Sequence, residues 1–92
     1  MLLEFNEAKS AENLKARGIG FERFADIDAE TAVSGKDIRK DYGERRLRVL
    51  GFIDGLLHAA VVTSRGEKIR VISLRRANRR EERAYAKERQ SS

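Results

Sequence analysis

Arginines cluster near the C-terminal end of this chain, as the two pairs Arg75-Arg76 and Arg79-Arg80. The first pair closes a segment with strand-like patterning, and the second opens a segment with helical patterning. A helix N-terminus carries partial positive charge, so arginines in its first turn are unfavourable unless an anion offsets them. Because a guanidinium group binds two phosphate oxygens and stays charged, this junction predicts a phosphate site, with exposed helix amides as further donors.

The overall charge distribution also indicates a polyanionic ligand. The 92 residues carry a net charge of +5. Residues 65–92 contain 10 basic and 4 acidic residues, whereas residues 1–64 contain 10 basic and 11 acidic residues. A basic C-terminal third on a nearly neutral body is the electrostatic pattern of a nucleic-acid-binding protein. The alternative is a solvated helix face without a ligand.

RNA cleavage without a metal ion is one reaction that such a site could perform. The 2′-hydroxyl attacks the adjacent phosphorus, and the reaction needs in-line positioning, a base, an acid and cations around the phosphate. Arg75 is our candidate for the main cation. Arg70 lies within a strand-like run, where an arginine either lines a cleft or pairs with an acid such as Glu44 or Glu81. Tyr85 offers a hydroxyl for a phosphate oxygen, or else anchors its helix to the sheet.

Candidates for the acid and the base are scarce. The polar stretch 35–44 contains Lys36 and Glu44, and the only histidine, His58, lies among apolar residues and is predicted to pack in the core or at an edge. Asp26, Asp28 and Glu30 fit a solvated acidic turn better than a metal site. No glycine-rich nucleotide loop is present. We therefore expect neither a metal nor a cofactor.

Composition limits the class of protein. The length predicts one domain over residues 1–92, with a modest core. The absence of cysteine favours a reducing cytoplasm. No apolar run approaches the ~20 residues of a membrane span, and no signal peptide is recognisable, so a membrane location is not expected.

The N-terminal half predicts one short strand followed by two helices. Residues 2–5 are strand-like, and Asn6 is placed to cap a helix that ends near Arg17, before Gly18. A second short helix is expected over residues 21–27. Residues 31–34 are a further strand candidate, and residues 35–44 are a predicted loop.

The C-terminal half predicts an antiparallel meander and a last helix. Strands are expected over residues 45–52, 56–64 and 68–75, joined at Asp54-Gly55 and at residues 65–67. Asn78 and Glu81 have the spacing of a capping box, which opens a helix to about residue 89. The predicted fold class is α+β, with two N-terminal helices packed on a mainly antiparallel sheet and a C-terminal helix.

Three blocks, in order, resemble the BrnT family of bacterial toxins. They are FNEAKSAENLKARGIGFE, GERRLRVLG and IRVISLRRANRREERAY. The matching positions are Phe5, Lys9, Asn13, Lys15, Gly18, Phe21, Glu44, Arg46, Gly51, Arg70, Ile72, Ser73, Arg75, Ala77, Glu81 and Tyr85. Asn6 stands where the family usually has aspartate and Arg17 where it usually has histidine, which leaves the acid and base roles open.

The resemblance implies a RelE/ParE-like fold and a toxin of a type II toxin-antitoxin system. Such a toxin would be an endoribonuclease acting on RNA, neutralised by a ribbon-helix-helix (BrnA-like) antitoxin and reaching operator DNA only through that antitoxin. The predicted catalytic residues are Arg75, Arg70, Tyr85 and Glu44. The predicted nucleic-acid-binding residues are Arg46, Arg76, Arg79, Arg80 and Lys36. The competing interpretations are a non-catalytic nucleic-acid-binding module and a purely structural interaction protein.

Overall fold

A computed structural model describes residues 2–36 and 45–90. In chain order the elements are β1 (Leu2–Glu4), α1 (Glu7–Arg17), the 3₁₀ helix η1 (Phe21–Asp26), β2 (Val33–Lys36), β3 (Arg46–Ile53), β4 (Leu56–Arg65), β5 (Lys68–Arg76) and α2 (Arg79–Gln90). The α+β prediction is confirmed. The second N-terminal helix is a 3₁₀ helix, and the strand expected at residues 31–34 lies two residues later.

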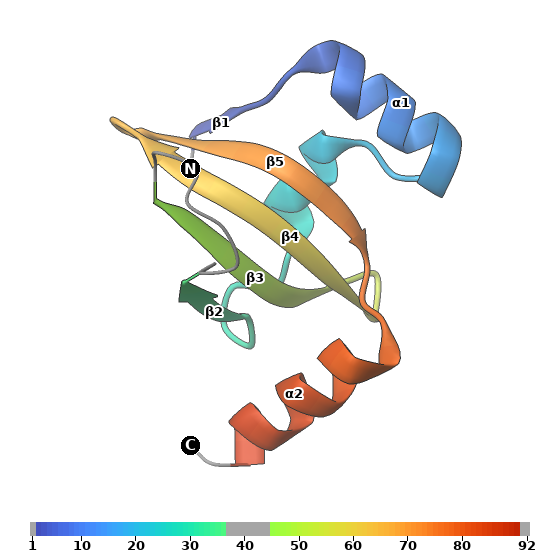
Figure 1. The fold of residues 1–92 in the computed structure, drawn as a ribbon, viewed down its shortest axis with the longest axis vertical. Coiled ribbons are helices and arrows are strands. Elements are labelled where there is room, and N and C mark those ends of the chain that lie inside the picture. The colour runs from blue at the N-terminus through green and yellow to red at the C-terminus, as the bar shows by residue number, and fades with distance from the viewer. Residues whose placement is uncertain (1, 37–44, 91–92) are drawn as a thin grey trace.

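One five-stranded sheet organises the molecule, in the order β1-β5-β4-β3-β2 (Figure 1). Strands β2 to β5 are antiparallel to their neighbours, as expected for a meander. Strand β1 instead pairs in parallel with the start of β5, so that Glu4 lies beside Arg70. The sheet is therefore mixed, and β1 and β5, the first and last strands in the sequence, are neighbours.

The turns form where the sequence predicts them. Asp54 and Gly55, between β3 and β4, both have positive φ values, 53° and 78°, which is the requirement of a tight type I′ hairpin. Gly18 ends α1 with φ 77°, and its N–H donates to the carbonyl of Leu14 at 2.8 Å. The Asn6 side chain caps the other end of α1 by accepting from the Lys9 N–H.

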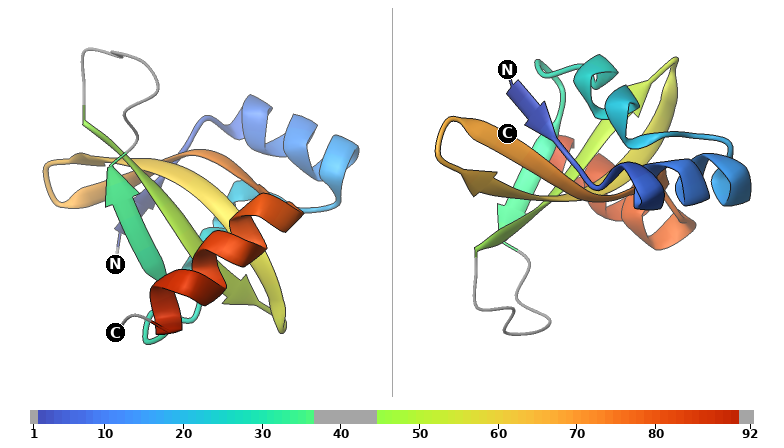
Figure 2. Two further views of the ribbon diagram at one scale, coloured as in Figure 1. Left: turned by 60° about the horizontal axis from the view of Figure 1, so that its bottom comes forward. Right: turned by 90° about the horizontal axis from the view of Figure 1, so that it is seen from above.

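The helices η1 and α2 lie on opposite faces of the sheet (Figure 2). The hydrophobic core is on the η1 face, where Phe21 and Phe24 pack with strand residues such as Val49 and Leu74. Because successive strand residues point to opposite faces, the apolar positions of β3 alternate with Arg46 and Arg48. The sheet face under α2 therefore receives the arginines.

Two polar side chains of α1 join it to the rest of the fold. The Asn13 amide donates to the carbonyls of Ile19 and Leu74, both at 2.8 Å. The Ser10 hydroxyl accepts from the Phe21 N–H at 2.8 Å. These bonds hold α1 along β5. None of the helices in residues 2–36 and 45–90 is long and apolar enough to span a membrane.

Candidate active site

Four strand arginines share the α2 face of the sheet: Arg46 and Arg48 from β3, Arg70 and Arg75 from β5. Arg70 and Arg75 are five residues apart, and in a regular strand they would point to opposite faces. A register shift in the β4–β5 ladder removes this conflict, because Val61 pairs with Ser73 whereas Val62 pairs with Val71. The extra residue of this β-bulge brings both arginines to one face.

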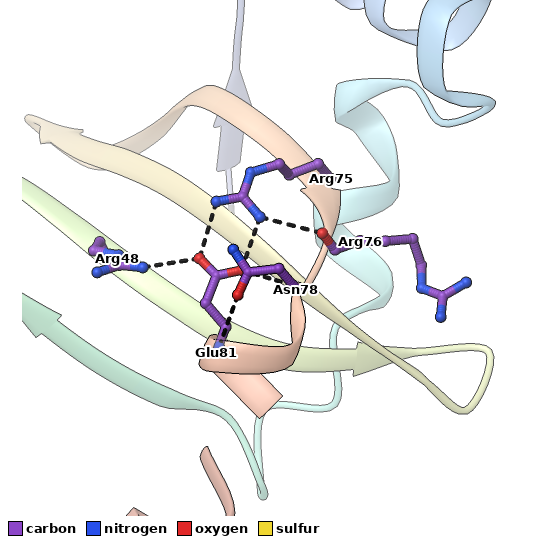
Figure 3. A network of polar contacts seen from close by, with 5 residues as sticks. All are labelled: Arg48, Arg75, Arg76, Asn78 and Glu81. Atoms are coloured by element: carbon purple, nitrogen blue, oxygen red, sulfur yellow. Dashed lines mark hydrogen bonds and ion pairs between the residues drawn. The ribbon is translucent and has the colours of Figure 1, made fainter. Parts of the chain in front are cut away.

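Arg75 and Arg48 meet on one carboxylate, that of Glu81 in α2 (Figure 3). Arg75 binds it with two parallel bonds, Nη1 to Oε1 at 2.8 Å and Nη2 to Oε2 at 2.9 Å. Arg48 donates from Nη2 to Oε2 at 2.8 Å. The two arginines come from strands that flank β4, so Glu81 links both sides of the sheet's centre.

Glu81 also completes the helix cap. Its backbone N–H donates to Asn78 Oδ1 at 2.8 Å, and the Asn78 N–H donates to Glu81 Oε1 at 2.9 Å, which confirms the predicted capping box. Only 4% of Glu81 is exposed. The Arg75 hydrogen bonds lower the pKa of the Glu81 carboxyl to about 2, against the opposing effect of burial and with help from the Asn78 N–H.

Arg75 lines two of the hollows that adjoin this cluster. One, of about 160 Å³, is lined by Arg48, Ser73, Arg75 and Glu81 over residues 59–61 of β4. The other, of about 340 Å³, lies between α1 and β5. Arg75 and Ser73 line both hollows, and Arg48 adds a second guanidinium group to the wall of the smaller one.

The hollow beside α1 brings in residues that the sequence did not identify as site residues. Lys9 and Arg17 line it together with Ser73 and Arg75. The Arg17 position, where the resembling family usually has histidine, thus lies at the site. An arginine there stays protonated, whereas a histidine can give up its proton near neutral pH.

Arg70 has a different partner from either one considered in the sequence. Its Nη1 donates to Glu4 Oε1 at 3.3 Å, because the parallel β1–β5 pair places these residues side by side. The suggested ion pair with Glu81 is wrong, since that carboxylate is occupied by Arg75 and Arg48. Glu44 lies outside the described residues.

The four arginines of the β5–α2 junction do not converge. Arg76 points away from the network around Arg75 (Figure 3), because neighbouring strand residues face opposite ways. Arg79 and Arg80 are the first two residues of α2 and are exposed. Arg80 lines a groove of about 430 Å³ between α2 and β2, and the wall of this groove also includes Arg48 and Glu81. Arg75, the main candidate of the four, is the one that binds Glu81, and Arg48 from β3 supplies the second guanidinium there.

The remaining predicted site residues are Tyr85, Arg46 and Lys36. The Tyr85 hydroxyl donates to the Thr31 carbonyl at 2.8 Å, and its ring packs edge-on to Phe52 with centroids 5.4 Å apart, which is the anchoring arrangement. Arg46 lies in β3, paired with Thr63. Lys36 ends β2, and no side-chain position is described for it.

His58 is buried, as predicted, with 5% of its surface exposed. Its Nδ1 lies 2.7 Å from the Leu56 carbonyl, so this nitrogen carries the proton and donates it to that oxygen. In the sheet His58 pairs with Gly51 and Arg76, which places it on the face opposite the arginine cluster.

Sequence comparison identifies the family. No curated protein sequence matches the chain significantly. The model of one family, described as the ribonuclease toxin BrnT of a type II toxin-antitoxin system, matches residues 5–81. The match covers most of the chain and includes Arg48, Arg75 and Glu81. This chain therefore belongs to the BrnT family of type II toxin-antitoxin ribonuclease toxins.

Proposed function

We propose that this protein is a metal-independent endoribonuclease that binds the scissile phosphate of RNA between Arg48 and Arg75. The supporting observation is the pair of guanidinium groups held over one hollow by Glu81. Two fixed cations suit a transition state in which negative charge accumulates on the phosphate oxygens. Arg46 and Arg70, on the same sheet face, bind flanking parts of the RNA backbone.

The proposed reaction is an in-line displacement at phosphorus. The 2′-oxygen loses its proton to a base and bonds to phosphorus, while the bond from phosphorus to the 5′-oxygen breaks and that oxygen takes up a proton. The products are a 2′,3′-cyclic phosphate and a 5′-hydroxyl. Glu44, just before β3, is our candidate base from its sequence position. Arg48 and Arg75 stabilise the charge on the non-bridging oxygens.

The proposed partner is a ribbon-helix-helix antitoxin that covers the arginine face in the cytoplasm. An acidic antitoxin segment would complement the basic surface and exclude RNA from the hollow. Charge complementarity of this kind speeds association and makes it salt-sensitive.

A second function has support in the structure, namely RNA binding without cleavage. The described residues include one histidine, and it is buried on the far face. The Tyr85 hydroxyl is engaged with Thr31. A binding module would retain RNA with strong salt dependence and leave it intact.

The deciding experiment is single-turnover cleavage of end-labelled RNA in EDTA, with identification of the fragment ends. Arg75→Ala should lower the rate by ~10²–10³-fold, as the loss of one charge-stabilising group does elsewhere. Arg75→Lys should recover only part of that loss, because lysine keeps the charge without the fork. RNA affinity should fall much less, since other cations remain.

Arg83→Ala is the matched control, because Arg83 is an exposed arginine of α2 that lines neither of the two hollows. It should leave the rate nearly unchanged. Equal, small losses for the Arg75 and Arg83 variants, or binding without fragments in the wild type, would replace the ribonuclease proposal by the binding module.

A further inference from the structure

The carboxylate of Glu81 has all its acceptor positions filled. Oε1 accepts from Arg75 Nη1 and the Asn78 N–H, and Oε2 accepts from Arg75 Nη2 and Arg48 Nη2, at 2.8–2.9 Å. An ionised carboxylate offers about four lone-pair sites. Glu81 is only 4% exposed and lines a hollow. The preference for acidic residues in the first turn of a helix does not explain why its carboxylate accepts four hydrogen bonds.

A role as general base does not fit Glu81. A base works best when its pKa is near the operating pH, whereas the pKa of Glu81 is lowered to about 2. No lone pair remains to accept the proton of a 2′-hydroxyl. Glu81 is therefore an anion at neutral pH.

A role as helix cap alone does not explain Glu81 either. The capping box uses the bonds with Asn78 and needs nothing from β3 or β5. The three bonds from Arg48 and Arg75 bury an ion network, and such networks add little net stability compared with apolar packing. What they add is a fixed geometry for two cations.

We propose that Glu81 is a positioning residue, which holds the guanidinium groups of Arg48 and Arg75 on either side of β4 so that both contact one phosphate. Within the described residues Arg48 bonds to Glu81 through a single Nη atom, so its other donors can face a ligand. Arg75 binds Glu81 through both Nη atoms, and its Nη1 also donates to the Arg76 carbonyl at 3.2 Å. The inference rests on the proposed function only in taking that phosphate to belong to RNA.

The first test is Glu81→Gln. A glutamine oxygen can accept from one arginine, while its amide nitrogen presents a donor to the other. The single-turnover rate should fall by about 10²-fold, the effect of misplacing a catalytic group by ~1 Å. The pH–rate profile should keep its shape, whereas loss of a general base would remove one limb of it. Glu81→Asp, which keeps the charge on a shorter chain, should recover part of the rate.

The matched control is Asn6→Ala, which removes the corresponding cap of α1 and none of the bonds to Arg48 or Arg75. It should lower stability and leave the rate of the folded protein unchanged. An equal, small effect of Asn6→Ala and Glu81→Gln on the rate would reduce Glu81 to a cap and overturn the inference.

A double-mutant cycle tests whether Glu81 acts through the arginines. In a background of Arg48→Ala and Arg75→Ala, adding Glu81→Gln should cause almost no further loss, because nothing remains to be positioned. A further loss as large as that in the wild-type background would show an independent role and overturn the inference.

Arginine side-chain NMR of the wild type separates this inference from the proposed function. Arg48 and Arg75 should show slow rotation of their guanidinium groups, and both should shift on addition of uncleavable 2′-O-methyl RNA. If the wild type cleaves no RNA but these signals are seen, the ribonuclease proposal fails and the positioning role stands. Freely rotating Arg48 in the folded wild type would overturn the positioning role, whether or not Glu81→Gln folds.

Discussion

The carboxyl group of Glu81 couples acid stability to the geometry of the candidate site. Its pKa is about 2 in the folded protein and 4.5 in its unperturbed form. A lowered pKa means that the ionised form is stabilised by folding, so the contribution is present above pH 4.5 and is lost as the pH falls towards 2. A difference of this size corresponds to on the order of 3 kcal/mol.

We therefore predict that Glu81→Gln flattens the pH dependence of the free energy of unfolding below pH 4.5. The measurement is urea unfolding of both proteins at a series of pH values from neutral to acidic. Glu82→Gln, which alters an exposed neighbour in the first turn of α2, is the control and should follow the wild type. Parallel curves for the wild type and the Glu81 variant would contradict the prediction.

A histidine at position 17 would place a group that exchanges its proton near neutral pH in the hollow beside Arg75. Arg17 lines the hollow shared with Arg75 but cannot give up its proton. Arg17→His should raise the single-turnover cleavage rate by up to about 10²-fold and add a limb near the histidine pKa to the pH–rate profile. Lys15→His, on an exposed part of α1 outside that hollow, should do neither. An identical profile for both variants would remove position 17 from the proton-transfer chemistry.

Among the elements, those with local signals could be predicted from the sequence. The Asp54-Gly55 hairpin, the Gly18 helix end and the Asn78–Glu81 cap depend on residues within a few positions of one another. The candidate site depends on contacts between distant residues. Strict alternation would send Arg70 and Arg75 to opposite faces, and only the bulge in the β4–β5 ladder reverses this.

Contacts between residues far apart in the sequence also explain why the partners of Arg70 and Arg48 were not predicted. Glu4 and Arg70 meet because β1 adds to the sheet in parallel, and Arg48 reaches Glu81 across an intervening strand. Residue types alone identified Arg75 as a candidate but not the carboxylate that holds it. The alternation of Arg46 and Arg48 with Leu47 and Val49 was the one local signal for the β3 contribution.

A glycine in β3 sets how closely the segment after η1 approaches the sheet. A Cβ at Gly51 would lie 2.5 Å from Ile27 Cγ2, whereas a Cβ at Gly35 in β2 would meet nothing within 4 Å. Gly51→Ala should lower the free energy of unfolding by about 1–3 kcal/mol through overpacking. Gly35→Ala should be neutral or stabilise by up to ~1 kcal/mol by restricting the unfolded chain. Chemical denaturation measures both, and equal effects would show that the close approach is not limiting.

For the whole molecule, the two faces of the sheet differ in chemical character. One face packs the core against η1, and the other carries the arginines. RNA affinity should fall with salt, with a slope of about −0.7 for each phosphate neutralised, and Arg48→Ala should reduce that slope by about one contact. Filter binding over a salt series measures this. An unchanged slope would place the RNA elsewhere on the protein.

If the antitoxin covers the arginine face, RNA and antitoxin exclude each other. Adding the cognate antitoxin at saturating concentration should release bound uncleavable RNA and abolish cleavage together. Fluorescence anisotropy of labelled RNA follows the release. A stable ternary complex that still cleaves RNA would contradict inhibition by occlusion.

The order of the elements along the chain determines when the arginine cluster can form during synthesis. Every strand of the sheet precedes Glu81, and β5, which carries Arg75, also pairs with the first strand. A ribosome-bound chain that stops before α2 has made both arginines but not the carboxylate that joins them. The two guanidinium groups can be fixed only after translation has passed Glu81. If Glu81 positions both arginines, incomplete translation products are inactive, and newly made protein becomes active only when its last helix folds against the sheet.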